Sequence, residues 1–381
     1  MIRKVLFYNR SDTFTRWGGD TTQMLKTKEA LEALGVAVDI TLQPTAKFSQ
    51  YDVLHIFNIQ TAGMSMQQIE LAKGKLAIVV SPIYWDLRHI EHDTDVLSCH
   101  QSRLARWVAG VDLLLAAKLL EVKRKLSPRL RRERQEKTKN CRNILLAADV
   151  LLPNSYAEAE ILALLFDAPW VRPKTIVVPN AVETAMFASA AVPDCKQRLP
   201  ERFILEVARF EPVKGQLRVL KALMDRPDIP LVFIGSDANS LYRKECAALA
   251  ELRGNTWFFS EIPHEELPAF YRRAKVHVLP SLRESPGLST LEAAASGCNC
   301  VFSFHAPVAE YFGTDGWCCD PCNIVSVRNA ILHAWEAPFN SALQKRVLEN
   351  FTWEAAAEKT LEAYTHITGA AETFEGREYG K

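Results

Sequence analysis

Short apolar runs alternate with helical patterns along most of the chain, and this alternation limits the fold more than any other feature. Runs of this kind are expected to be buried parallel strands, each followed by a helix that crosses back over the sheet. We predict strands over residues 4–8, 37–42, 53–58, 76–81, 150–153, 175–178, 203–207, 231–234, 257–259, 276–279 and 300–303. The order predicts an α/β protein with two Rossmann-like, doubly wound parallel sheets.

A change of pattern near the middle of the chain marks the expected domain boundary. Small residues and prolines interrupt both the strand and the helix periods over residues 188–200, which we interpret as a hinge. A chain of 381 residues is long enough for two domains with separate cores. We therefore expect an N-terminal domain over 1–184 and a C-terminal domain over 185–352.

Two glutamates, Glu284 and Glu292, bracket seven residues directly after the predicted strand 276–279. Ser289 and Glu292 have the spacing of a capping box, which predicts a helix that opens there and ends at Gly297. The free N–H groups and the dipole of such a helix favour an anion above the strand. One carboxylate could then meet a polyol beside the anion and the other a second hydroxyl-bearing group, as in a nucleotide sugar. A cap and a solvated loop charge are the structural alternative.

Cationic residues follow the predicted strand 203–207. Arg209 and Lys214 lie five residues apart at the entrance to the helical run 216–224. A guanidinium fork and an ammonium together suit the two charges of a diphosphate. The structural alternative is an Arg209–Glu211 pair and a solvated Lys214.

Glycines follow two further predicted strands. Gly235 comes after strand 231–234, and Gly18 and Gly19 come between the first strand and the helix expected over 23–34. Glycine lets a backbone approach a ligand closely, although a tight turn explains each position nearly as well.

Taken together and in order, these segments resemble the retaining glycosyltransferases of the two-domain GT-B type, in particular the group 1 enzymes usually called family 4. The segments that carry the resemblance are Gly18-Gly19, 148–155, 178–183, 208–215, 279–293 and 350–354. The resemblance implies two domains that face each other across a cleft. It also implies that the last helix crosses back, so that residues 353–381 complete the N-terminal domain.

The resemblance also implies roles for individual residues. Arg209 and Lys214 would hold the donor diphosphate, Glu284 the donor sugar and Glu292 the ribose. Donor-binding positions would further include Gly18, Gly19, Gly235, Ser285, Pro286, Gly287, Leu288 and Ser289.

One first-domain stretch departs from the family pattern. Many members carry a histidine and then an aspartate after a strand near the donor sugar, but this chain reads Tyr84-Trp85-Asp86. We assign these three residues to the sugar or acceptor side. The sequence does not place the nearby His89 or His92 in the site.

The resulting functional prediction is a cytoplasmic, retaining glycosyltransferase of polysaccharide or glycoconjugate biosynthesis. Its donor would be a UDP- or GDP-sugar, and its acceptor a glycan, a lipid-linked molecule or a protein. Charge on the leaving diphosphate would be stabilised by Arg209, Lys214 and helix amides, without a metal or other cofactor. The alternatives are a sugar-nucleotide epimerase or hydrolase of the same fold and a non-catalytic scaffold.

The charge balance and the cysteines bear on which ligands and cross-links the protein is expected to have. With 46 Lys and Arg against 45 Asp and Glu, the chain shows no global signal for nucleic acid. Nine cysteines, an odd number, argue for reduced thiols. Cys318, Cys319 and Cys322 are close in sequence, but they lack a second ligand pair at a usual zinc spacing, so no metal site is predicted.

A basic segment stands out in the otherwise balanced chain. Residues 118–142 hold eleven Lys or Arg against three Glu, and an apolar stripe precedes them within 111–126. Three interpretations stay open for 111–142: a peripheral contact with the inner membrane face, a helical pair that covers the first domain, and a surface for an anionic acceptor.

Overall fold

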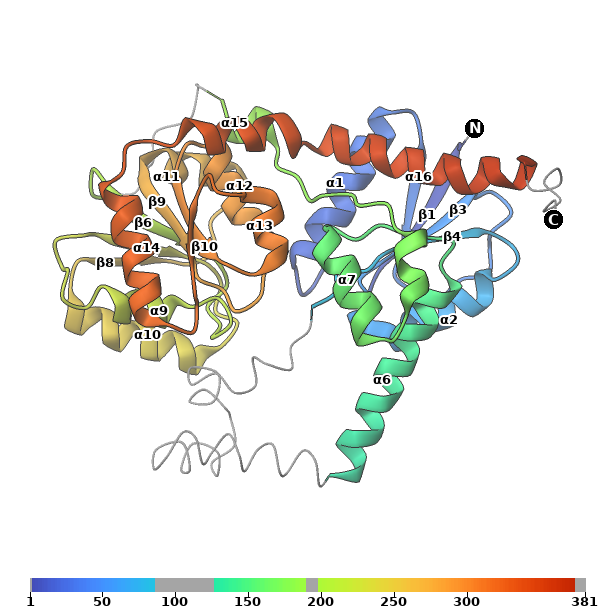
Figure 1. Cartoon of the computed structure of the whole chain (residues 1–381), viewed down its shortest axis with the longest axis horizontal. Helices are drawn as coiled ribbons and strands as arrows, with labels where there is room; N and C mark the ends of the chain where they lie inside the picture. The colour runs from blue at the N-terminus through green and yellow to red at the C-terminus, as the bar shows by residue number, and fades with distance from the viewer. Residues whose placement is uncertain (1, 86–126, 190–197, 374–381) are drawn as a thin grey trace. The chain divides into compact units, whose positions relative to one another are not determined.

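A computed structural model describes residues 2–85, 127–189 and 198–373 of the chain (Figure 1). These residues divide into two compact units. Unit 1 comprises 2–85, 127–181 and 353–373, and unit 2 comprises 182–189 and 198–352. Most of the expected hinge, 190–197, lies outside the described residues.

Unit 1 is a five-stranded parallel sheet with helices on its faces. Its elements are β1 (Lys4–Tyr8), α1 (Gly19–Ala33), β2 (Ala37–Thr41), β3 (Val53–Phe57), η1 (Ile59–Thr61), α2 (Ala62–Ala72), β4 (Ala77–Ser81), α6 (Pro128–Ala147), β5 (Val150–Leu151), α7 (Tyr156–Leu165), η3 (Pro169–Lys174) and α16 (Trp353–Thr373). The strand order is β2-β1-β3-β4-β5. After β2 is added on one side of β1, the later strands are added on the other side, so the strand order reverses between β1 and β3.

Unit 2 repeats this plan with six parallel strands. Its elements are α8 (Thr184–Phe187), β6 (Phe203–Val207), α9 (Gln216–Ala222), β7 (Leu231–Ile234), α10 (Ser240–Arg253), β8 (Thr256–Phe259), η4 (His264–Glu266), α11 (Leu267–Arg273), β9 (Ala274–Leu279), α12 (Leu288–Ala295), β10 (Asn299–Ser303), α13 (Ala306–Phe312), β11 (Trp317–Cys319), α14 (Ile324–Glu336) and α15 (Ser341–Asn350). The order is β11-β10-β9-β6-β7-β8, so the reversal lies between β6 and β9.

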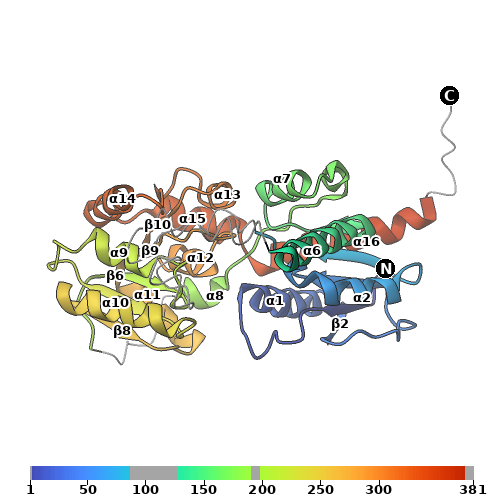
Figure 2. The same ribbon diagram turned by 90° about the horizontal axis from the view of Figure 1, so that it is seen from below.

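The strands of unit 2 are buried because apolar layers cover both faces of the sheet. One layer joins alternate strand residues to α9, α10 and α14, and the other joins the remaining residues to α11, α12 and α15. Figure 2 shows helices on both sides of the strands. Two-sided burial explains why these strands are continuous apolar runs in the sequence. Two parallel-sheet, Rossmann-like domains are thus confirmed.

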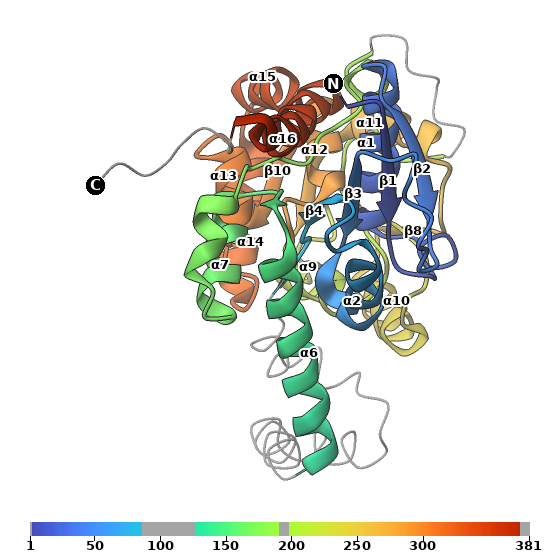
Figure 3. The ribbon, with the colours of Figure 1, turned by 90° about the vertical axis from the view of Figure 1, so that its right-hand side faces the viewer.

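The last helix belongs to unit 1. Helix α16 begins at Trp353, directly after unit 2 ends at Thr352, and it packs against α1 (Figure 3). Its Tyr364 is fully buried, and the hydroxyl group lies 2.6 Å from Nδ1 of His55 on β3. The other ring nitrogen of His55 lies 2.9 Å from the Ser81 hydroxyl on β4. A polar chain through the core therefore joins the helix to two strands.

Three predictions about elements are wrong. Residues 175–178 form no strand, and Thr175 makes only an isolated bridge to Leu151. The sequence reading missed β11, a three-residue strand that pairs with β10. Helix α1 begins at Gly19 rather than Gln23. In each case the deciding contact is with a distant segment or lies at an element end, where local pattern is weakest.

Candidate active site

The candidate site of unit 2 lies where the loops after β6, β7 and β9 meet. Ligands of open parallel sheets bind at the carboxyl ends of the strands beside a reversal of strand order, which here falls between β6 and β9. A Cβ atom on Gly215 would lie 2.8 Å from the Pro280 carbonyl oxygen, and one on Gly235 would lie 2.0 Å from that of Ala208. Glycine is therefore required at both positions for the three loops to pack.

Lys214 and Glu284 meet directly at this reversal point. The Lys214 ammonium group donates to Oε1 of Glu284, and the two side chains are 20% and 13% exposed. Lys214 follows β6 and Glu284 follows β9, so neighbouring strands of the sheet bring together residues 70 positions apart. The alternative in which Lys214 is merely solvated is wrong.

Arg209 lies in the same loop as Lys214 but is more open. Its guanidinium donates to Oε1 of Glu211 at 3.0 Å, with 46% of its side chain exposed. The Arg209–Glu211 pair, considered from sequence as the structural alternative, is thus present. An exposed ion pair contributes little stability, so a ligand could replace Glu211 at small cost.

Helix α12 directs its first turn toward the same loops without a side-chain cap. It begins at Leu288 after Gly287, whose φ of +87° favours glycine, and a Cβ atom there would lie 2.9 Å from Leu279. The capping box predicted from Ser289 and Glu292 is therefore wrong, because the helix begins one residue before Ser289. Amide N–H groups in a first helical turn lack intrahelical acceptors, so those of Leu288 and Ser289 suit an anion. The bond before Pro286 is cis.

Glu292 is bound from two other elements. Its Oε1 lies 2.8 Å from Nε2 of His264 in η4, and its Oε2 accepts from the Tyr271 hydroxyl of α11 at 3.0 Å. The helix does end where predicted, since Ser296 is its C-cap and Gly297 follows with a φ of +93°.

Glu206 on β6 is a further acidic residue that sequence reasoning missed. It is 1% exposed, and neither carboxyl oxygen has a hydrogen-bond partner among the described residues. Burial raises the pKa of Glu206 well above its ordinary value, and the charge of Glu284 acts in the same direction. Lys214 and Arg218 lower it without prevailing. In sequence this residue reads only as part of an apolar strand.

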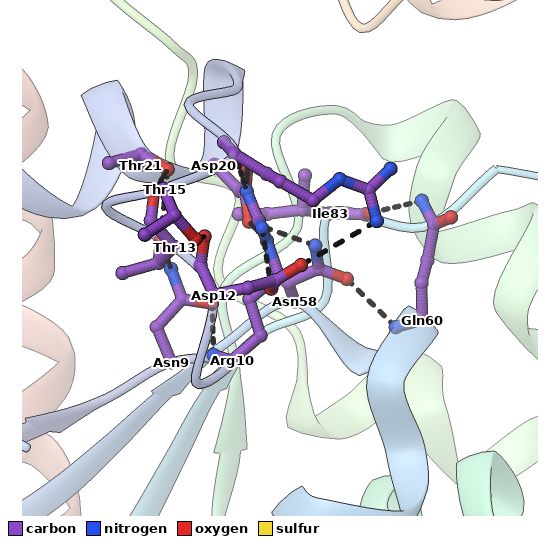
Figure 4. Close-up of polar contacts among 11 residues, drawn as sticks. Asn9, Arg10, Asp12, Thr13, Thr15, Asp20, Thr21, Asn58, Gln60 and Ile83 are labelled. Atoms are coloured by element: carbon purple, nitrogen blue, oxygen red, sulfur yellow. Dashed lines mark hydrogen bonds and ion pairs between the residues drawn. The ribbon is translucent and has the colours of Figure 1, made fainter. Parts of the chain in front are cut away.

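Unit 1 has a polar cluster at its own reversal point, between β1 and β3 (Figure 4). Asp20, 8% exposed in the first turn of α1, accepts from Nε of Arg10 at 2.9 Å and from the Asn58 amide at 3.0 Å. Burial opposes the charge of Asp20, but these hydrogen bonds hold its pKa below the ordinary value. A Cβ atom on Gly18 would lie 2.8 Å from Oδ1 of Asp20. The carboxylate thus gives a structural reason for Gly18.

The same cluster extends to the loop after β4. The Asn58 side chain accepts from the Gln60 backbone at 2.8 Å, and the Gln60 amide donates to the Ile83 carbonyl at 3.1 Å. Three strand-end loops are therefore fixed to one another. The available sequence signal was the placement of polar residues directly after predicted strands.

The stretch assigned to the sugar or acceptor side is only partly described. The Tyr84 amide donates to Glu158 at 2.8 Å, and the Tyr84 ring packs against Phe166. Trp85 is half-buried. Asp86, His89 and His92 lie outside the described residues.

The described residues contain neither a disulfide nor a cluster of side chains suited to a metal ion. Cys298, Cys300 and Cys319 are buried, Cys318 and Cys322 are exposed, and none of the five forms a disulfide within the described residues. No group of three or more His, Cys, Asp or Glu side chains suited to a metal occurs among the described residues.

Comparison with known proteins finds a family match in the C-terminal part of the chain. The pattern of the family "Glycosyl transferases group 1" matches residues 194–350, which include Arg209, Lys214, Glu284 and Glu292. This match and the relatives support a group 1 glycosyltransferase. A D-inositol 3-phosphate glycosyltransferase from Actinosynnema mirum is 26% identical over 91% of this chain and 92% of its own.

Other relatives align over a shorter stretch. A D-inositol 3-phosphate glycosyltransferase from Acidothermus cellulolyticus is 29% identical, with 53% of each chain covered. A glycogen synthase from Mycobacterium tuberculosis is 28% identical over 49% of this chain and 47% of its own. The chain thus aligns with about half the length of these curated relatives.

Solved structures of glycosyltransferases share the fold. A sucrose-phosphate synthase from Thermosynechococcus elongatus superposes with a TM-score of 0.71 at 18% identity, covering 97% of this chain and 100% of the other. A trehalose-phosphate synthase from Burkholderia vietnamiensis gives 0.66 at 14% identity, covering 97% and 98%. At these identities the similarity establishes the GT-B fold alone.

Proposed function

We propose that the protein transfers a sugar from a nucleoside-diphosphate sugar to a hydroxyl acceptor, with retention of configuration and without a metal. The observation that carries this proposal is the meeting of Lys214 and Glu284 beside the uncapped α12. Two cationic side chains and a helix N-terminus at one reversal point suit a diphosphate, and the adjacent carboxylate suits sugar hydroxyls.

Donor binding would exchange the existing ion pairs for contacts with the ligand. Lys214 would leave Glu284 for the diphosphate, which frees the Glu284 carboxylate to accept hydrogen bonds from the sugar. Arg209 would likewise leave Glu211. The pairs therefore keep both charged partners satisfied before the donor arrives.

The chemical step would depend on the leaving group. As the bond to the anomeric carbon breaks, negative charge grows on the diphosphate. Arg209, Lys214 and the amides of Leu288 and Ser289 would stabilise that charge, and donors fixed in advance stabilise a transition state more than water does. Retention is inferred from the resemblance to family 4.

Substitution of Lys214 or Glu284 tests the proposal. We expect Lys214→Met and Glu284→Gln each to lower kcat/KM for transfer about 10²- to 10³-fold, measured with a panel of UDP- and GDP-sugars and candidate acceptors. Lys345→Met and Glu349→Gln are matched controls, because they break an exposed pair at 3.8 Å on α15. Full transfer by Glu284→Gln would show that this site is wrongly assigned, and sugar release without an acceptor would favour a hydrolase.

Metal independence has its own test. We expect transfer to continue unchanged after dialysis against EDTA, because the diphosphate charge is opposed by Arg209, Lys214 and helix amides. Loss of activity in EDTA, restored by added Mg²⁺ or Mn²⁺, would contradict the proposal.

A peripheral contact with an anionic membrane belongs to the same proposal, together with a cytoplasmic location. Within residues 128–139 of α6, every side chain whose burial is described is exposed. These turns project from the rest of unit 1 (Figure 3). Residues 111–126 lie outside the described part of the chain. Among the described helices, none is long and apolar enough to cross a membrane. Flotation with anionic liposomes at low salt is the test, and no binding would end this part of the proposal.

A further inference from the structure

The exposed aromatic side chains of unit 1 gather at one edge of its sheet. Among the described residues of this unit, three aromatic residues and three leucines are the large apolar residues exposed to solvent. The aromatic residues all directly follow strands, at the carboxyl edge of the sheet: Phe14, Trp17 and Tyr156. The leucines all lie at the C-terminal ends of helices, away from that edge: Leu34, Leu146 and Leu164. Ligands of open parallel sheets bind at the carboxyl edge.

Hydrogen bonds anchor the loop 10–18, which carries two of the aromatic residues (Figure 4). The Arg10 guanidinium donates to Asp12 at 2.7 Å within the loop, and it also binds the first turn of α1, as described above. The buried Thr13 and Thr21 hydroxyl groups lie 2.9 Å apart and join the loop to the same helix. The polar side chains of the loop are thus bound within unit 1.

The aromatic residues of this anchored loop are open to solvent. Phe14 is 49% exposed and Trp17 is 53% exposed. The indole N–H of Trp17 donates to the Thr22 hydroxyl at 3.0 Å, so the ring is held in place although half of the residue lies in solvent. Apolar surface that is fixed and exposed at a ligand-binding edge marks an interaction site.

Tyr156 is held in a comparable way. It is the first residue of α7 and is 71% exposed, and the preceding Ser155 caps the helix by accepting from the Glu158 amide at 2.9 Å. The side-chain amides of Gln23 and Asn154 pair with each other at 2.9 and 3.2 Å, which joins α1 to the loop after β5. Both aromatic segments therefore belong to one fixed edge of unit 1.

The chemistry of this edge matches a chain of sugars. A sugar ring has apolar C–H faces, which pack on aromatic rings, and a rim of hydroxyl groups. Beside Phe14 and Trp17, the side chains of Asp12 and Arg16 are 38% and 76% exposed and can accept from and donate to such hydroxyls. Strands β3 and β4 separate β1 from β5, a span of about 14 Å at ordinary strand spacing, which is longer than one sugar ring.

We propose that Phe14, Trp17 and Tyr156 bind successive sugar rings of the acceptor, which is therefore an oligosaccharide. The inference rests on the proposed function, which requires an acceptor but leaves its class open. A membrane surface suits this edge less well. The charges of Arg10, Asp12, Arg16 and Asp20 sum to zero, so the loop offers no attraction to anionic lipid.

The test is ligand-detected NMR titration of the full-length protein with maltotetraose, α-mannotetraose and chitotetraose. We expect the wild type to bind at least one of them. Trp17→Ala and Tyr156→Ala should each weaken that binding about 3- to 10-fold, because each removes one aromatic contact. Trp17→Phe keeps an aromatic ring and should bind within about twofold of the wild type.

Leu164→Ala is the matched control, because Leu164 is an apolar residue of the same helix as Tyr156, 73% exposed and at the other end. It should bind as the wild type does. A wild type that binds no tetrasaccharide, or alanine variants that bind as tightly as the control, would overturn the inference. Loss of flotation with anionic liposomes in Trp17→Ala and Tyr156→Ala, with tetrasaccharide binding unchanged, would also overturn it in favour of a membrane contact.

Nucleotide titration separates this inference from the proposed function. The proposed donor site lies in unit 2, so UDP and GDP should bind all of these variants as they bind the wild type. A wild type that binds tetrasaccharide but neither nucleotide would overturn the proposed function. Normal nucleotide binding without tetrasaccharide binding would overturn only the oligosaccharide acceptor.

Discussion

The buried carboxyl group of Glu206 makes the stability of the protein depend on pH. The side chain has no hydrogen-bond partner among the described residues, and its pKa is raised because burial disfavours the charged form. The folded protein therefore binds a proton that the unfolded chain releases above its ordinary pKa of 4.5. Stability from this group is present below that value and is lost as pH rises toward the folded pKa.

We expect Glu206→Gln to be at least as stable as the wild type at pH 8, because glutamine has nearly the same shape and carries no ionisable group. The gain should shrink as pH falls toward 4.5. Thermal unfolding of both proteins between pH 5 and 8 is the measurement. A variant that is less stable at pH 8 would show that Glu206 is ionised and paired with Lys214 or Arg218 in the folded state.

Also at the residue scale, Glu292 shows that the spacing of a capping box does not by itself establish a helix cap. The spacing from Ser289 predicted a cap, yet the helix starts at Leu288 and the carboxylate contacts His264 and Tyr271. A capping box depends on where the first turn begins, and Gly287 sets that point through its backbone conformation. The predicted ribose contact remains a prediction.

At the scale of elements, a buried polar contact joins helix α16 to the sheet of unit 1. Its Tyr364 and the His55 side chain of β3 satisfy each other inside an apolar core. The family resemblance predicted this last helix, but not the partner of its tyrosine.

We expect Tyr364→Phe to destabilise unit 1 by about 1–3 kcal/mol, because Nδ1 of the buried His55 loses its partner. Denaturant unfolding measures the change. Thr365→Ala on the exposed side of the same helix should change stability by less than about 0.5 kcal/mol. Equal stability of Tyr364→Phe and the wild type would mean that this contact does not hold the helix.

At the scale of the whole molecule, buried titratable groups divide unevenly between the units. Burial lowers the pKa of His55 in unit 1 and of His277 in unit 2 to about 3, from 6.5. Below pH 6.5 the unfolded chain binds protons that these folded histidines do not. Their contribution to stability is therefore lost as pH falls, at about 1.4 kcal/mol per pH unit for each. Glu206 of unit 2 acts in the opposite direction above pH 4.5.

We expect the two units to respond differently to mild acid. Between pH 7 and 5.5, unit 1 should lose about 1 kcal/mol through His55, whereas in unit 2 the effect of Glu206 opposes that of His277. Scanning calorimetry should show one transition moving to lower temperature, and Tyr364→Phe would identify it as that of unit 1. Two transitions that move together would contradict the expectation.

The sequence by itself determined the two parallel sheets, most strand positions and the loops where the charged residues lie. Burial on both faces imposes long apolar runs, and strand-end glycines mark close packing, so both features are visible locally. It could not determine that Lys214 binds Glu284, that Tyr271 and His264 hold Glu292, or that Glu206 is unpaired. Strand order decides the Lys214–Glu284 contact, because the pairing of β6 with β9 brings the loops after these strands to one edge of the sheet. The Glu292 contacts depend instead on the packing of α11 against α12 and η4, and the state of Glu206 depends on its burial within the sheet.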